Sequence, residues 1–236
     1  MQKEEKQPER ASDKQQLIIN NLTIHKELYR AIACFNALFF LYLCRIFTRR
    51  IVIMTKANKV LFITQEITPY VSESEMANIG RNLPQAIQEK GREIRTFMPK
   101  WGNINERRNQ LHEVIRLSGM NLIIDDTDHP LIIKVASIQS ARMQVYFIDN
   151  DDYFQNRLQT ADENGVEYDD NDSRAIFYAR GVLETVKKLR WIPDVIHCHG
   201  WISALTALYI KRMYADDPCL KNAKIVYSIY NDDFKT

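Results

Sequence analysis

Apolar and polar residues alternate along the chain in a way that predicts a strand, a helix and a second strand. Lys59–Thr64 (KVLFIT) is a continuous apolar run, typical of a strand buried on both faces of a parallel sheet. Met76–Lys90 has a helical period and is followed by Gly91, a residue that commonly ends helices. Pro84 lies inside this helix and is expected to kink or weaken it. Glu93–Met98 is the next predicted strand and completes a βαβ-like unit. The apolar side of the helix comprises Met76, Ile79, Leu83 and Ile87.

The second half of the chain returns to this alternation after a different stretch. Residues 111–148 hold short β-rich segments separated by turn residues, which predicts antiparallel hairpins or a meander beside the main sheet. Residues 149–171 are acidic and polar and are expected to form a loop. Asp172–Leu189 is a clear helical pattern, which Asp172 or Ser173 can cap. The remaining predicted elements are a strand at Asp194–Cys198, a helix at Ser203–Tyr214 and a strand at Lys224–Ile229.

This order of elements predicts an α/β fold: a Rossmann-like, doubly wound, mostly parallel sheet with a small antiparallel insertion. In such sheets ligands bind at the carboxyl ends of the strands. Polar side chains follow each predicted strand, as a binding crevice requires. These strand-end residues are Gln65, Glu66, Lys100, Trp101, Asp149, Asn150, His199, Tyr230 and Asn231.

Composition and charge exclude several other functions. The 236 residues include 32 Lys and Arg against 30 Asp and Glu, but nine basic and five acidic residues fall within 1–53. The remainder, 54–236, therefore has no basic surplus for a nucleic-acid backbone, so no nucleic-acid partner is expected. The seven glycines form neither a dinucleotide fingerprint nor a P-loop. The four cysteines form no CxxC pair and indicate free thiols in a reducing, cytoplasmic compartment.

The N-terminal segment 1–53 is interpreted as an extension separate from the domain 54–236. Its apolar run, Ala31–Cys44, would span about 21 Å as a helix, short of the ~30 Å hydrocarbon core of a membrane. A marginal membrane anchor is one reading, although a membrane partner is not expected. The other reading is an upstream extension without function, because Met54 resembles a natural start just before the first strand.

Five strings at the strand ends carry a family resemblance. They are KVLFITQEITPY, FMPKWGNI, VYFIDNDDYFQNR, YDDNDSRAIFYARGVLE and WIPDVIHCHGW. In this order they resemble the N-terminal domain of bacterial glycogen synthases and plant starch synthases, glycosyltransferases of family five with the GT-B fold. The resemblance covers about Lys59 to Asn231. It implies retaining transfer of glucose from ADP-glucose to an α-1,4-glucan, with those two compounds as partners and no cofactor.

The resemblance also assigns roles to residues of this chain. His199, in a His-x-His string, is expected against the donor glucose, and Asp170 is expected to face the acceptor or donor sugar; both are catalytic candidates. A carboxylate suits such a place because it accepts hydrogen bonds from sugar hydroxyls. The substrate-binding candidates are Glu66, Asn171, Trp201, Tyr230 and Asn231.

Other interpretations of these residues stay open. In a strand, His197 and His199 share one face, and His197 is favoured as a core histidine. A zinc site would need further ligands that the sequence does not offer, so no metal is expected. The acidic run around Asp170 also fits a solvated loop and helix cap. Five aromatic residues can offer apolar faces to sugar rings, although such residues are more often core: Trp101, Tyr153, Phe154, Trp201 and Tyr230.

The chain departs from the family where a diphosphate would lie. The family's Lys-Thr-Gly-Gly string is matched here by residues 72–75 (SESE), which replaces the lysine and the glycines and adds Glu73 and Glu75. Tyr230 stands in place of a histidine, and Arg81 is only a weak substitute for the lysine. Two carboxylates disfavour a diphosphate, since like charges repel more strongly in a cleft of low dielectric.

Three hypotheses for function follow. The chain is half of a synthase whose C-terminal nucleotide domain is supplied by a separate chain, or a non-catalytic glucan-binding or regulatory module, or a fragment of a longer enzyme. In each case we expect that the chain by itself does not transfer glucose, because a retaining transfer needs positive charge on the leaving diphosphate.

Overall fold

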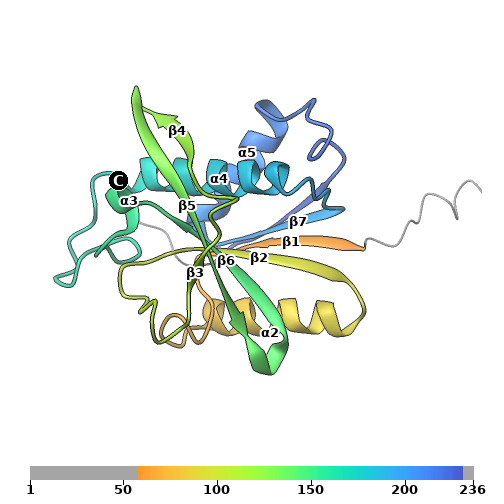
Figure 1. The fold of residues 1–236 in the computed structure, drawn as a ribbon, viewed down its shortest axis with the longest axis horizontal. Coiled ribbons are helices and arrows are strands. Elements are labelled where there is room, and N and C mark those ends of the chain that lie inside the picture. Colours follow the sequence, from red (N-terminus) through yellow and green to blue (C-terminus); the bar gives the residue numbers. More distant parts are fainter. Residues whose placement is uncertain (1–57, 231–236) are drawn as a thin grey trace, which may run out of the picture. The chain divides into compact units, whose positions relative to one another are not determined.

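The computed structural model describes residues 58–230, which form an eight-stranded sheet with helices on both faces (Figure 1). The predicted extension, with its Ala31–Cys44 run, and Asn231 lie outside the described residues. The strand order is β3-β5-β6-β2-β1-β7-β8, and β4 pairs with β5. The strands are β1 (Lys59–Ile63), β2 (Glu93–Pro99), β3 (His112–Glu113), β4 (Met120–Ile124), β5 (Thr127–Ile138), β6 (Met143–Asp149), β7 (Val195–His199) and β8 (Lys224–Ser228).

The parallel part of the sheet confirms the predicted fold class. Strand β1 lies at its centre, parallel to β2 on one side and to β7 on the other. Leu61, Phe62 and Ile63 are fully buried, as a continuous apolar run predicts for a central strand covered on both faces. Strands β6 and β8 extend the parallel set outward from β2 and β7.

The antiparallel segment differs in part from the prediction. It was expected beside the main sheet, but its last strand, β6, joins that sheet by pairing parallel to β2 and antiparallel to β5. Only His112–Glu113 of the first β-rich segment forms a strand. Strands β4 and β5 form a hairpin that projects past the helix α4 (Asn171–Lys188) (Figure 1). Its turn holds Asp125 and Asp126 in the left-handed region, at φ 49° and 63°.

The helices divide between the two faces: α2 (Glu75–Glu89) lies on one face, and α4 and α5 (Ala204–Arg212) lie on the other (Figure 1). This split follows from the chain direction, because the β1–β2 connection and the β6–β7 connection step in opposite directions along the sheet. Residues 149–171 are not wholly loop, since a short helix there buries Tyr153 and Phe154. The helices are α2 (Glu75–Glu89), α3 (Asp151–Phe154), α4 (Asn171–Lys188) and α5 (Ala204–Arg212), with 3₁₀ turns at Gln139–Ala141 and Trp201–Ser203.

The contact face of α2 is made largely of small residues. Ala77, Gly80 and Pro84 are buried together with Met76, whereas the predicted apolar residues Ile79, Leu83 and Ile87 are only partly buried. Gly80 explains why the buried face of α2 differs from the predicted one, because its lack of a side chain lets the helix approach the backbone carbonyl of Glu66. The helix runs unbroken to Glu89 with Pro84 inside it. Glu66, in the β1–α2 connection, and the second turn of α2 are thereby held close together.

Candidate functional site

Polar groups gather at the carboxyl ends of β6, β2, β1, β7 and β8. These five strands are neighbours and run parallel, so their carboxyl ends lie along one edge of the sheet. The sequence-predicted residues occupy this edge through the segments that follow each strand. Two groups of side chains can be distinguished there. The histidine cluster comprises His197, His199 and Tyr230, on and just after β7 and β8. The carboxylate cluster comprises Glu66, in the β1–α2 connection, and Asp170, in the 149–171 segment.

The histidine cluster consists of His197, His199 and Tyr230, with Ser228 beside them. The rings of His197 and His199 lie 4.0 Å apart between centroids, so the prediction that they share one strand face is confirmed. His199 is only 1% exposed, and its Nδ1 lies 2.9 Å from the Tyr230 hydroxyl. Its Nε2 is buried and has no hydrogen-bond partner among residues 58–230. A ligand hydroxyl would satisfy that nitrogen.

His197 is engaged within the protein. Its Nε2 lies 2.9 Å from the Ser228 hydroxyl, and its ring packs edge-on against Phe62. This agrees with the favoured interpretation of a satisfied histidine, but His197 is half-buried and not part of the core. No group of three or more metal-ligating side chains is found in the part of the chain that the structure describes.

Burial determines the protonation state of this cluster. Burial, and then the neighbouring His197, lowers the pKa of His199 to about 3, and burial also lowers the pKa of His197. Both imidazoles are therefore neutral near pH 7. His199 can exchange hydrogen bonds with a sugar hydroxyl, but it supplies no positive charge to a diphosphate.

Acid is expected to destabilise the fold through His199. The unfolded chain takes up a proton near pH 6.5, whereas the folded chain resists it until about pH 3, so stability is present above pH 6.5 and is lost as the pH falls toward 3. At pH 5 the expected loss from this group is about 2 kcal/mol. Urea unfolding of the protein and of His199→Gln at pH 7 and pH 5 measures it. If the free energy of unfolding changed equally with pH in both proteins, the loss of stability could not be assigned to His199.

The carboxylate cluster begins at Glu66, a predicted substrate-binding residue. One Glu66 oxygen accepts a hydrogen bond from the Ser74 hydroxyl, and the other accepts from Gln159 Nε2 at 2.9 Å. Ser74 is also the N-cap of α2 and accepts from the Ala77 amide at 2.9 Å. Glu75 occupies the first turn. One amide at the start of α2 is therefore already capped by the Ser74 hydroxyl, which itself donates to Glu66.

Arg81 does not replace the missing lysine. Its guanidinium donates to Gln85 at 2.6 Å and to Ser140 at 3.0 Å. Ser140 belongs to the 3₁₀ turn between β5 and β6, at the end of these strands opposite the candidate site. The prediction that Arg81 could replace the family's lysine is therefore wrong, because its side chain is bonded at the opposite end of these strands.

Asp170 is held by an arginine that the sequence analysis did not identify. Arg157 donates two hydrogen bonds of 2.6 Å to the two Asp170 oxygens, and its guanidinium lies 4.4 Å from the ring centroid of Tyr168. Asp170 occupies the cap position of α4 but makes no side-chain capping bond, and neither Asp172 nor Ser173 takes that position. The prediction that Asp172 or Ser173 caps this helix was wrong, because the helix already begins at Asn171 and both residues lie inside it.

Asn171 and Arg174 fasten the 149–171 segment to α4. Asn171 is 3% exposed, and its amide donates to the Thr160 carbonyl at 2.9 Å and accepts from Arg174 at 2.8 Å. Arg174 is fully buried and also donates to three backbone carbonyls of this segment. A buried arginine carries no distinctive sequence pattern, so its role was visible only in the structure. The substrate role of Asn171 stays a prediction.

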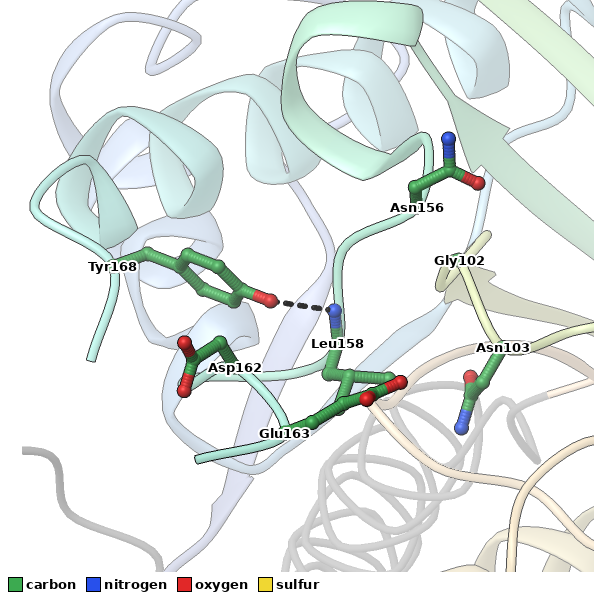
Figure 2. Close-up of a pocket in the computed structure, with 7 residues that line it drawn as sticks. All are labelled: Gly102, Asn103, Asn156, Leu158, Asp162, Glu163 and Tyr168. Atoms are coloured by element: carbon green, nitrogen blue, oxygen red, sulfur yellow. Dashed lines mark hydrogen bonds between the residues drawn. The ribbon is translucent and has the colours of Figure 1, made fainter. Parts of the chain in front are cut away.

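A hollow of about 290 Å³ lies where the segment after β2 meets the 149–171 segment. Figure 2 shows Gly102 and Asn103 on one side, Asp162 and Tyr168 on the other, and Leu158 between them. The Tyr168 hydroxyl accepts from the Leu158 amide at 3.0 Å. The acidic character of 149–171 was the only sequence signal for this hollow. Its lining residues are Gly102, Asn103, Asn156, Leu158, Asp162, Glu163 and Tyr168.

The predicted aromatic platform is mostly core. Trp101, Tyr153 and Phe154 are at most 6% exposed, so they offer no ring face to a sugar. Trp201 begins the 3₁₀ turn after β7 and is half-buried, as is Tyr230. Among the predicted aromatics, only these two combine partial exposure with a place at the strand ends.

The order of the strings, the sheet and the strand-end groups can be compared with known proteins. The sequence profile of the starch synthase catalytic domain matches residues 59–236. This chain belongs to that family. The glycogen synthase of Chlorobium limicola is 40% identical over 180 residues, which cover 75% of this chain and 37% of that protein. The glycogen synthase of Chlorobaculum tepidum is also 40% identical over 180 residues, with the same coverage.

The starch synthase family member described here also shares its fold with a solved relative. The catalytic domain of starch synthase IV from Arabidopsis thaliana, bound to ADP and acarbose, superposes with a TM-score of 0.61 at 21% identity. The match covers 73% of this chain and 34% of that one, and it confirms the predicted α/β architecture with a mostly parallel sheet. The chain spans a little over a third of the length of the curated relatives it matches. None of the helices within residues 58–230 is long and apolar enough to cross a membrane.

Proposed function

We propose that this chain is the glucan-handling half of a glycogen or starch synthase-type glucosyltransferase. Its family membership supports the reaction class, transfer of glucose from ADP-glucose to an α-1,4-glucan. The observation that carries the site assignment is His199, whose buried Nε2 lacks a partner among the described residues. In this proposal His199 binds a sugar hydroxyl, while Asp170 and Glu66 accept hydrogen bonds from others.

The chain alone is proposed not to complete the transfer. Departure of a nucleoside diphosphate requires cationic or amide groups directed at its oxygens. His199 is neutral near pH 7, and the start of α2 is capped by Ser74. A second domain, carried by a separate chain or by further sequence, would have to supply that charge. We place the reaction in the cytoplasm, since Cys198 and Cys219 are free thiols.

The test is transfer of labelled glucose from ADP-glucose into glycogen. The purified chain is assayed alone, and then with the purified C-terminal part of the Chlorobium limicola glycogen synthase; that intact enzyme is the positive control. We expect the chain alone to give less than about a thousandth of the control rate. Incorporation by the chain alone that disappears in His199→Ala would overturn the proposal.

The alternative is a non-catalytic glucan-binding or regulatory module. The observation that favours it is that Ser74, which donates to Glu66, already caps the Ala77 amide at the start of α2. This alternative predicts glucan binding without transfer in both arms of the assay. Transfer that appears only when the C-terminal part is added would favour the half-enzyme over the module.

A further inference from the structure

We propose that the carboxyl-end surface of this chain selects an uncharged glucan segment over phosphate-bearing ligands, and that Glu75, at the capped start of α2, sets this selectivity. The inference rests on the proposed function and deepens it by naming the ligand class of the same site. Three observations support it: the capping contacts at the start of α2, the ion pairs of the neighbouring cations, and the buried polar atoms that lack a partner.

The start of α2 is a poor place for an added anion. A free helix N-terminus attracts phosphate because its first amides point outward and the helix dipole is positive there. Here the Ser74 hydroxyl accepts from the Ala77 amide, and Glu75 adds an exposed carboxylate in the first turn. Glu73 adds a second exposed carboxylate just before the cap. A diphosphate at this end would meet two negative charges beside an already capped helix.

Glu66 adds to this negative charge. Its two oxygens accept from the Ser74 hydroxyl and the Gln159 amide, which are both neutral donors. No ion pair of Glu66 is present among the described residues, so its charge is not cancelled locally. The same two hydrogen bonds tie the 149–171 segment to the start of α2. The Glu66 carboxylate is thus held in place just after the carboxyl end of β1.

Among residues 58–230, four cations near these strand ends are already engaged, whereas Arg107 and Arg108, in the segment after β2, are exposed. Lys100 lies 3.2 Å from Glu106, and Lys134 lies 2.7 Å from Asp149 and from Glu106. Arg157 is paired with Asp170, and the remaining cation, Arg174, is fully buried against backbone carbonyls. To bind a phosphate with any of them, the protein would first have to break these contacts.

The polar atoms that lack a partner in the described residues suit hydroxyls. The His199 Nε2 and the Gln65 Oε1 are buried and have no hydrogen-bond partner in the described residues, and they lie at the ends of the adjacent strands β7 and β1. The hollow in Figure 2 is lined by amides and carboxylates and by neither Lys nor Arg. The hydrogen bond from the Val166 amide, together with those from Asn164, holds the pKa of Asp162 below its usual range, so that carboxylate is ionised. A sugar hydroxyl can donate to an acceptor and accept from a donor, whereas a phosphate oxygen near neutral pH mainly accepts.

Calorimetric binding to the full chain tests the proposal, with maltoheptaose as the uncharged probe and ADP and inorganic pyrophosphate as the charged probes. We expect maltoheptaose to bind at least about tenfold more tightly than either charged probe. In Glu75→Gln at low salt, the affinity for ADP and pyrophosphate is expected to rise about threefold to tenfold, with the maltoheptaose affinity unchanged. The double variant Glu73→Gln/Glu75→Gln should strengthen this effect.

Glu89→Gln is the matched control, because it removes the same charge from the opposite end of the same helix and should leave all three affinities unchanged. Equal affinity of the wild-type chain for ADP and maltoheptaose would overturn the inference while leaving the proposed function standing. An unchanged ADP affinity in both Glu75 variants would do the same. Failure of maltoheptaose to bind at all would overturn the inference and the proposed function together.

Discussion

Replacing Arg174 by methionine is expected to lower the free energy of unfolding by about 4 kcal/mol, the largest effect we predict for a single substitution. The guanidinium is fully buried and donates to the carbonyls of Tyr153, Leu158 and Gln159 and to the Asn171 side chain. Methionine fills much of the volume but leaves these acceptors buried without a donor. Burial lowers the pKa of Arg174 to about 10, so the donor is still protonated near pH 7.

The measurement is urea unfolding followed by circular dichroism at pH 7. Arg212→Met on the exposed side of α5 makes the same chemical change where no buried contact is lost, and it should cost less than about 0.5 kcal/mol. Because Arg174 holds the segment that carries Arg157, Gln159 and Asp170, glucan binding should fall as well. Equal stabilities of the two variants would show that the carbonyl contacts contribute little.

Gly80→Ala is expected to destabilise the protein by about 3 kcal/mol, although alanine normally favours a helix over glycine by about 1 kcal/mol. A Cβ at this position would meet the Glu66 backbone carbonyl far inside van der Waals contact, with Ile67 also close. A backbone carbonyl cannot move aside as a flexible side chain can. The helix would have to shift away from β1, which would disturb the Ser74–Glu66 contact at its beginning.

Thermal and urea unfolding of Gly80→Ala should be compared with Gly91→Ala. Gly91 has φ +73° and open space around it, so alanine there carries backbone strain without a clash and should cost about 1 kcal/mol. A larger cost at Gly91 than at Gly80 would refute the role of close packing. Maltoheptaose binding by Gly80→Ala would also report whether the disturbed α2 start affects the site.

The types and order of the main elements were predictable from local pattern. The apolar run in β1 and the helical period of α4 each depend on neighbours in sequence, so burial of their faces followed directly. The alternation of strand and helix then placed His199 at the carboxyl end of a parallel strand. The two-residue period of a strand also predicted that His197 and His199 share a face, as their ring contact confirms.

The chemistry of the site depended on contacts that no local pattern contains. Gln159 donates to Glu66, which lies 93 positions away in the chain. Arg157 forms an ion pair with Asp170, which the sequence predicted to face a sugar. The joining of β6 to the main sheet was likewise invisible, because a β-rich segment does not specify its pairing partner.

The sequence by itself determined the α/β architecture, the family and the place of the strand-end residues, because periodicity and short strings act over a few residues. Only the tertiary structure decided which of those polar groups are engaged and which remain available. Glu66, Asp170 and Asn171 already form hydrogen bonds with other protein groups, although each carboxylate oxygen can accept a further one. His199 Nε2 and Gln65 Oε1 are buried without a described partner. Hydrogen bonding and desolvation depend on which distant segments the fold brings together, and they fix the charge and the free polar atoms that a ligand meets.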